Sequence, residues 1–227
     1  ETYEPLTIVD SYVLTSLDIH KVSSNSVSIL TNTMEGLVRS GRNIGEVEKG
    51  IASSWSFDSN TMTWTFTLNS SSYWVNEEGV RQRVVTASDF VYAWDRAKAY
   101  AESQNDFVFQ QMTIESYQAI NATTLKVKVS EYIPYFLMEL STPFFYPIAS
   151  EKVNLYNENY GSGIDKVWYN GPFYLSEWNN EDSAVLTKNN NYWDASSVKT
   201  PLVNILFYKY GNDYSTEDID IFNSYVN

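Results

Sequence analysis

The chain has 227 residues, of which 43% are hydrophobic and 19% are charged, a balance typical of folded rather than disordered proteins. Its formal net charge of −13 argues against nucleic acid as a partner, because phosphate contacts need clustered Lys and Arg. The chain has no cysteine, which excludes disulfides, thiolate catalysis and cysteine zinc sites.

The first predicted elements are a short strand and a helix. Residues 6–9 form an apolar run typical of a strand. Residues 23–38 read as a helix capped by Ser24 to Ser26, since four apolar side chains recur at helical spacing: Val27, Leu30, Met34 and Leu37. Gly36 lies near the expected end of this helix.

The middle of the chain alternates strand and helix signals. Residues 62–68, MTWTFTL, place apolar and threonine side chains on opposite faces, which predicts a strand, paired in a hairpin with the preceding SWSF. Asn76 to Gly79 predicts a turn. Thr86 and Asp89 then resemble a capping box that opens a helix with Phe90, Trp94, Ala97 and Ala101 on one face.

The remaining elements complete the expected fold class. Residues 125–129 form another alternating strand, and Pro134 suits the start of a short helix. A hairpin is expected across Asn179 to Asp182, and residues 203–210 predict a final strand. Strands with a few helices and no regular βαβ rhythm indicate a mixed α/β, or α+β, fold.

Nothing in the sequence favours catalysis or a metal site. His20 is the only histidine and no nucleophile-elbow motif is present, so a structural or surface role is favoured for it. Four acidic residues between Asp213 and Asp220 lack the spacing of a calcium loop and read as a solvated segment. We therefore expect no catalytic residues, no metal and no cofactor.

No apolar run approaches the roughly 20 residues that a membrane span requires, and no signal peptide is visible. A secretion signal or lipid anchor would have to lie outside this chain.

Seven segments, read in order from residue 16 to residue 195, resemble the oligopeptide-binding proteins of bacterial ABC importers, the extracellular solute-binding proteins of family 5. These segments are SLDIHK, TMEGLVR, GIASSWSFDSNTMTWTFTL, YWVNEEGVRQRVVTASDFVYAWDRA, SEYIPYFLMELSTPFFYPI, YNGPFYLSEW and LTKNNNYWDA. Ile19 stands where the family has proline. The chemistry of these motifs is mainly architectural: caps, turns and core-facing aromatics.

The resemblance implies a periplasmic-binding-protein-like lobe of type II with an inserted accessory α+β domain. Residues 1–32 and 166–227 are expected to form the first ligand-binding lobe, and residues 33–165 the accessory domain. The second ligand-binding lobe, which follows in the family, is expected to be missing, so the chain would hold the N-terminal half.

The resemblance further implies an extracellular, non-enzymatic protein that captures oligopeptides and delivers them to an ABC permease. It would be a cell-surface lipoprotein of a Gram-positive bacterium or a periplasmic protein, reaching the membrane through a lipid anchor not present in this chain. Hinge closure of two lobes would enclose the ligand. The extended peptide backbone would be held largely through main-chain hydrogen bonds.

The candidate ligand residues are Val22, Ser23, Ser24 and Asn25, after SLDIHK, and the turn at Asn170 and Gly171. A purely structural role in capping and turning the chain is an equal alternative for them. A peptide-signal receptor or surface interaction protein on the same fold is the alternative function. Oligosaccharide, and less so nickel or haem, are alternative ligands.

Overall fold

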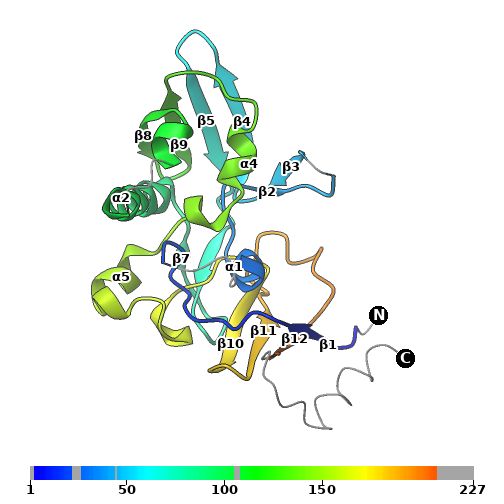
Figure 1. Cartoon of the computed structure of the whole chain (residues 1–227). Helices are drawn as coiled ribbons and strands as arrows, with labels where there is room; N and C mark the ends of the chain where they lie inside the picture. The colour runs from blue at the N-terminus through cyan, green and yellow to red at the C-terminus, as the bar shows by residue number, and fades with distance from the viewer. Residues whose placement is uncertain (1–2, 22–26, 44, 105–107, 209–227) are drawn as a thin grey trace.

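The computed structural model describes residues 3–21, 27–43, 45–104 and 108–208, and two four-stranded sheets organise this part of the chain (Figure 1). The first sheet has the order β1-β12-β11-β10. Its strands are β1 (Leu6–Asp10), β10 (Phe173–Asn179), β11 (Ser183–Lys188) and β12 (Leu202–Phe207). β1 and β12 are parallel, with Leu6 opposite Val203, so segments from the two ends of the described chain share one sheet.

The second sheet is antiparallel throughout and has the order β4-β5-β9-β8. Its strands are β4 (Ala52–Asp58), β5 (Thr63–Leu68), β8 (Ile114–Asn121) and β9 (Thr124–Val129). The predicted alternation of β5 is confirmed: Trp64, Phe66 and Leu68 are buried while Thr67 is exposed. The apolar face of this sheet packs against α2 (Ala87–Ser103) and α4 (Phe136–Leu140), and the Phe136 and Trp64 rings stack 5.5 Å apart.

The block from Tyr73 to Ala97 forms a hairpin followed by α2, as its sequence predicts. β6 (Tyr73–Val75) and β7 (Arg81–Val84) flank the turn at Asn76 to Gly79, and Gly79 has a φ of 72°. Asp89 accepts hydrogen bonds from the Thr86 amide at 2.8 Å and the Trp74 indole at 3.3 Å. This carboxylate therefore joins the cap of α2 to the hairpin before it.

The helix expected over 23–38 is shorter than predicted. α1 spans Val27–Thr33, and Val38 begins the strand β2 (Val38–Ser40); the expected Ser24 to Ser26 caps lie outside the described residues. The carbonyls of Gly36 and Leu37 accept hydrogen bonds from the Ile51 and Ala52 amides, at 2.9 Å each, rather than from a following helical turn. Met34 and Leu37 are therefore buried loop residues, and their apolar spacing does not mark a helix.

The smaller elements lie along the chain between the strands of the two sheets. They are β3 (Val47–Lys49), α3 (Val108–Gln111), α5 (Ser150–Tyr156) and the 3₁₀ turns η2 (Pro143–Phe145), η3 (Asn157–Asn159) and η4 (Ile164–Lys166). The predicted short helix after Pro134 and the hairpin across Asn179 to Asp182 are confirmed as α4 and as β10–β11.

One hydrophobic core runs through both sheets, joining side chains such as Leu17, Trp94 and Leu175. The strands of the first sheet come from 1–32 and 166–227, and those of the second from 33–165. The division of the chain into domains at these boundaries stays a prediction.

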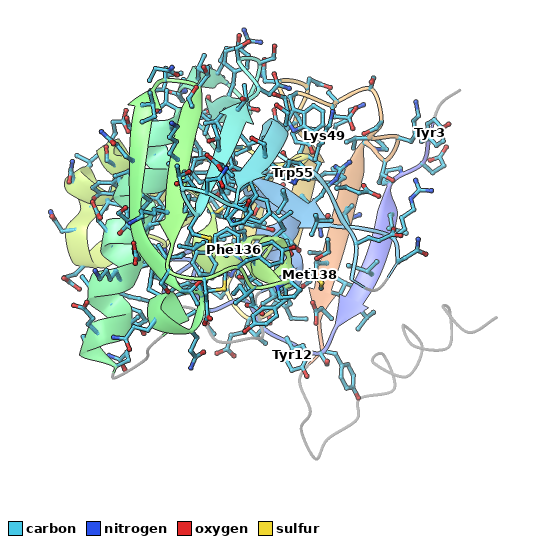
Figure 2. The ribbon with its side chains drawn as sticks, turned by 90° about the horizontal axis from the view of Figure 1, so that it is seen from above. Tyr3, Tyr12, Lys49, Trp55, Phe136 and Met138 are labelled. Carbon is cyan, nitrogen blue, oxygen red and sulfur yellow. The ribbon has the colours of Figure 1, made fainter. Side chains whose placement is uncertain are left out.

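β1 forms the open edge of the first sheet, and no strand of the described residues pairs with its outer side. Its apolar side chains Leu6, Ile8 and Val9 are exposed. Figure 2 shows Tyr3 and Tyr12, also exposed, beside the two ends of this strand. An exposed apolar edge of this kind is a surface on which another polypeptide can pair.

Candidate functional site

The first group of candidate ligand residues, Val22 to Asn25, lies outside the described residues. The chain just before them is fixed by the Arg96 cluster, formed by Asp18, His20, Arg96 and Tyr160. Arg96, on α2, donates two hydrogen bonds to the Asp18 carboxylate, at 2.7 and 2.6 Å. Asp18 is 1% exposed, so this bidentate pair neutralises a buried charge.

His20 has a structural position in this cluster, as the sequence favoured. Its Nδ1 lies 2.8 Å from Arg96 Nη1, its ring edge meets the Phe144 ring, and it is 4% exposed. Burial, and then the nearby Arg96 charge, lower the pKa of His20 to about 4. His20 is therefore neutral near pH 7 and accepts the guanidinium hydrogen bond through Nδ1.

Gly161 completes the Arg96 cluster from the opposite side. Its carbonyl accepts the Leu17 amide at 2.8 Å, and it has a φ of 79°. A Cβ atom at this position would lie 2.3 Å from the Asp18 backbone nitrogen. Only glycine therefore lets the two backbones approach this closely.

The second group, Asn170 and Gly171, holds the end of α1. The Asn170 side chain accepts the Glu35 amide at 3.0 Å and donates to the Glu35 carbonyl at 3.1 Å. Gly171 donates its amide to the Thr33 carbonyl at 3.0 Å. Asn170 is 1% exposed with both side-chain polar atoms engaged, so any effect of this side chain on a ligand runs through the segment it holds.

Around Asn170 the structure assembles a second buried cluster, the Glu35 junction, formed by Glu35, Arg39, Asn170, Tyr192 and Trp193. The Tyr192 hydroxyl donates to Glu35 Oε1, and the Trp193 indole donates to Oε2 at 2.6 Å. Arg39 on β2 donates to the Tyr192 hydroxyl at 3.2 Å and lies 3.9 Å from the Glu35 carboxylate. Burial raises the pKa of Glu35 to about 7, against the lowering effect of these donors.

The asparagine-rich segment at 189–191 connects this junction to the β6–β7 hairpin. The Asn189 side chain donates to the Gly171 carbonyl at 3.0 Å. Asn191 donates to the Gly79 carbonyl at 3.0 Å and accepts from Arg81 at 3.0 Å. Val75 and Tyr169 exchange two backbone hydrogen bonds of 2.8 Å nearby. Four of the seven segments that carry the family resemblance thus meet at one place: 33–39, 73–97, 169–178 and 186–195.

A cavity open to solvent lies at the end of the first sheet. It has a volume of about 480 Å³ and is lined by residues 13–15, Trp178 and residues 180–182. The β10–β11 turn stands beside the carboxyl ends of β1 and β12, since Asp10 is opposite Phe207, and the Phe207 amide donates to the Asp182 carbonyl at 2.9 Å. In open sheets with parallel strands, ligands characteristically bind at the carboxyl ends of the strands.

Sequence reasoning named Asn170 and Gly171 as candidate ligand residues, which stays a prediction, but it missed Glu35, the partner of Asn170, and the role of Arg96. The signal for both was present, since Glu35 and Arg96 belong to segments quoted for the resemblance, TMEGLVR and YAWDRA. The acidic residues between Asp213 and Asp220 lie outside the described residues. Among the described residues there is no group of three or more His, Cys, Asp or Glu that could hold a metal ion. In the same part of the chain no helix has the length and apolar character needed to cross a membrane.

Proteins named for peptide binding are similar to this chain over most of its length. The Bacillus subtilis dipeptide-binding protein DppE is 34% identical over 185 residues, covering 75% of this chain and 33% of its own length. The Bacillus subtilis oligopeptide-binding protein OppA is 31% identical over 210 residues, covering 84% of this chain and 37% of its own length. The chain therefore spans about a third of the length of these relatives.

Solved structures share the fold. The substrate-binding domain of an oligopeptide ABC transporter from Bacillus anthracis superposes with a TM-score of 0.81 at 26% identity, over 97% of this chain and 44% of that one. A peptide-bound OppA from Listeria monocytogenes superposes with a TM-score of 0.83 at 22% identity, over 97% and 45%. The mixed α+β fold predicted from the sequence is confirmed.

The family described as "Bacterial extracellular solute-binding proteins, family 5 Middle" matches residues 46–217, which is most of the chain. The resemblance read from the seven segments is thereby confirmed, and the chain belongs to the bacterial extracellular solute-binding proteins of family 5.

Proposed function

We propose that this chain forms one wall of the peptide-binding cleft of a solute-binding protein, which captures oligopeptides outside the cell and delivers them to an ABC permease. The observation that carries the proposal is the family match over residues 46–217, together with relatives named for dipeptide and oligopeptide binding. The protein binds and releases its ligand without chemical change, and a lipid anchor or the periplasm keeps it near the permease.

In this proposal residues 1–32 and 166–227 form the ligand-binding lobe, and 33–165 form the accessory domain. Val22 to Asn25 contact the peptide backbone, while Asn170 and Gly171 act by holding Thr33 and Glu35, eight and ten residues after Asn25. The carboxyl ends of β1 and β12 and the cavity beside them continue the same wall. Extended peptides offer main-chain donors and acceptors to such a wall, and water fills the space around variable side chains.

Calorimetry with defined peptides of two to nine residues tests the proposal. It is run on this chain and on the full product of its gene. We expect saturable binding by the full product, and weaker or no binding by this chain, because a second wall is needed to enclose the ligand. Hydrolysis of any peptide during the titration would contradict a role in binding alone.

A single substitution and a matched control test whether Asn25 contacts the peptide. Asn25→Ala in the full product is expected to weaken peptide binding by about tenfold, as loss of one or two buried hydrogen bonds does. The matched control is Asn60→Ala. Asn60 lies in the turn between β4 and β5, which belong to the second sheet and not to the proposed ligand-binding lobe. Equal affinities for the two variants would contradict a ligand contact at Asn25.

A peptide-signal receptor is the second candidate function. A pheromone receptor, PrgZ, whose structure reports its mode of peptide binding, superposes with a TM-score of 0.77 at 25% identity, over 96% of this chain. Uptake of labelled peptide by cells separates the two. An importer subunit supports accumulation of many peptides, whereas a receptor responds to one sequence.

A further inference from the structure

The Glu35 carboxylate lies between two parts of the chain that are distant in sequence. Glu35 belongs to the segment between α1 and β2, and it is 4% exposed. Both carboxylate oxygens accept hydrogen bonds from Tyr192 and Trp193, beyond β11, while its backbone amide and carbonyl are held by Asn170. A change in the charge of this one group therefore acts on every contact across the junction.

The charges around Glu35 are unbalanced. Among the described residues, Arg39 is the cation that faces it, and the same guanidinium lies 3.4 Å from Glu48 on β3 and 4.0 Å from Asp194. Three carboxylates thus share one positive charge. The other titratable groups that face Glu35 are the phenols of Tyr146 and Tyr192, whose pKa values burial raises above the usual range, so both stay neutral. Burial disfavours the ionised form of Glu35 most, and a proton on this carboxyl also relieves the excess negative charge.

We propose that Glu35 is a proton-dependent latch: the junction is most stable when its carboxyl is protonated, and ionisation loosens the contact between residues 33–39 and the segment at 170–193. This inference concerns the fold itself and stands whether or not the chain binds peptide. It explains why a buried acid is placed between two segments that neutral side chains could have joined.

The sign of the effect follows from proton linkage. The pKa of Glu35 is raised from 4.5 to about 7 in the folded chain. The closed junction therefore holds a proton that the open junction releases. The stability it gains is fully present below the ordinary pKa and is lost as the pH rises through the raised one.

Amide hydrogen exchange measured by NMR tests the latch on this chain. The reporters are the amides of residue 35 and Gly171, which bond directly across the junction. After correction for the intrinsic exchange rate, the opening constant at both amides is expected to rise by up to tenfold per pH unit between about pH 5 and about pH 7.

Two variants identify Glu35 as the source. Glu35→Gln keeps the shape but cannot ionise, so its opening constant is expected to stay flat over the same range. The matched control is Glu46→Gln on the neighbouring hairpin, whose carboxylate is exposed and pairs with Asn43 at 2.8 Å. This control is expected to keep the wild-type slope.

A flat wild-type profile, or a slope that persists in Glu35→Gln, overturns the proposal. Should Glu35→Gln fail to fold, Tyr192→Phe decides instead. It removes a donor that favours the ionised carboxylate, so the upper end of the pH-dependent range is expected to move to higher pH. An unchanged or lowered upper end in Tyr192→Phe would also overturn the latch.

Discussion

The Arg96 cluster and the Glu35 junction each bury a carboxylate, but they differ in the positive charge that faces it. Each buries a carboxylate where the first sheet's segments meet the rest of the molecule: Asp18 is 1% exposed and Glu35 is 4% exposed. Asp18 has a guanidinium of its own, at 2.7 and 2.6 Å. Glu35 shares Arg39, 3.9 Å away, with two other carboxylates. Asp18 thus has its own counter-charge, whereas burial raises the pKa of Glu35 to about 7 because the guanidinium that it shares offsets the effect only in part.

The two clusters consequently respond to pH in opposite directions. The pKa of His20 is lowered to about 4, so the folded chain binds fewer protons there than the unfolded chain, and stability at this site rises with pH. The pKa of Glu35 is raised to about 7, so stability at the junction falls with pH. The contributions of these two sites therefore oppose each other between about pH 4.5 and about pH 6.5.

Removing the charge of Arg96 is expected to have the largest effect. Arg96→Met leaves Asp18 buried without its partner, which should lower the free energy of unfolding by about 3–5 kcal/mol. Urea denaturation measures this change. Arg42→Met is the matched control, because Arg42 is exposed and its loss should change stability by less than about 0.5 kcal/mol. Similar values for the two variants would mean that the bidentate pair is not the anchor inferred here.

A Cβ atom at Gly161 tests how tightly the same cluster is packed. Gly161→Ala adds both backbone strain, from a φ of 79°, and a contact of 2.3 Å with the Asp18 nitrogen. We expect thermal unfolding to show a loss of about 2–4 kcal/mol, combining strain and overpacking. Gly45→Ala isolates the strain, because Gly45 has a φ of 88° and no atom within 4 Å of the added carbon. Equal losses would assign the whole effect to backbone conformation.

Local elements of this fold were readable from sequence because their signals are local. The alternation in β5, the turn at Asn76 to Gly79 and the cap at Thr86 and Asp89 each depend on residues within a few positions of one another. The length predicted for the helix over 23–38 was wrong because a distant contact, rather than a local signal, decides where it ends. Its second half is held by Asn170, 135 positions away, and no pattern in the segment itself reveals that partner.

The candidate site was only partly readable for the same physical reason. Asn170 and Gly171 were singled out by resemblance, but the partners that give them a role, Glu35 for Asn170 and Asn189 for Gly171, lie 135 and 18 residues away. Arg96 was quoted within a helix motif, yet its bond to Asp18 spans 78 positions. Spacing predicts which face of an element is buried, whereas the pairing of buried charges needs the tertiary structure.

Variants that remove the titration of His20 or of Glu35 should change stability less than the Arg96 and Gly161 variants do. In the wild-type chain the two sites oppose each other between about pH 4.5 and about pH 6.5, so the free energy of unfolding should change little there. His20→Asn keeps an acceptor for Arg96 but cannot titrate, so stability should fall as the pH rises. Glu35→Gln should show a rise instead. Each slope is at most about 1.4 kcal/mol per pH unit. Slopes of the same sign in both variants would contradict the opposition of the two sites.

An ion pair beside the Arg96 cluster should have the smallest effect. Lys21 lies three residues after Asp18 and pairs with Glu158 at 3.3 Å, but their side chains are 40% and 93% exposed. Water already solvates both charges, so Lys21→Ala should cost less than about 1 kcal/mol, and high salt should remove the difference from wild type. Urea denaturation at low and high salt measures this. A salt-insensitive loss as large as that of Arg96→Met would show that position in the chain, rather than burial, decides the strength of these contacts.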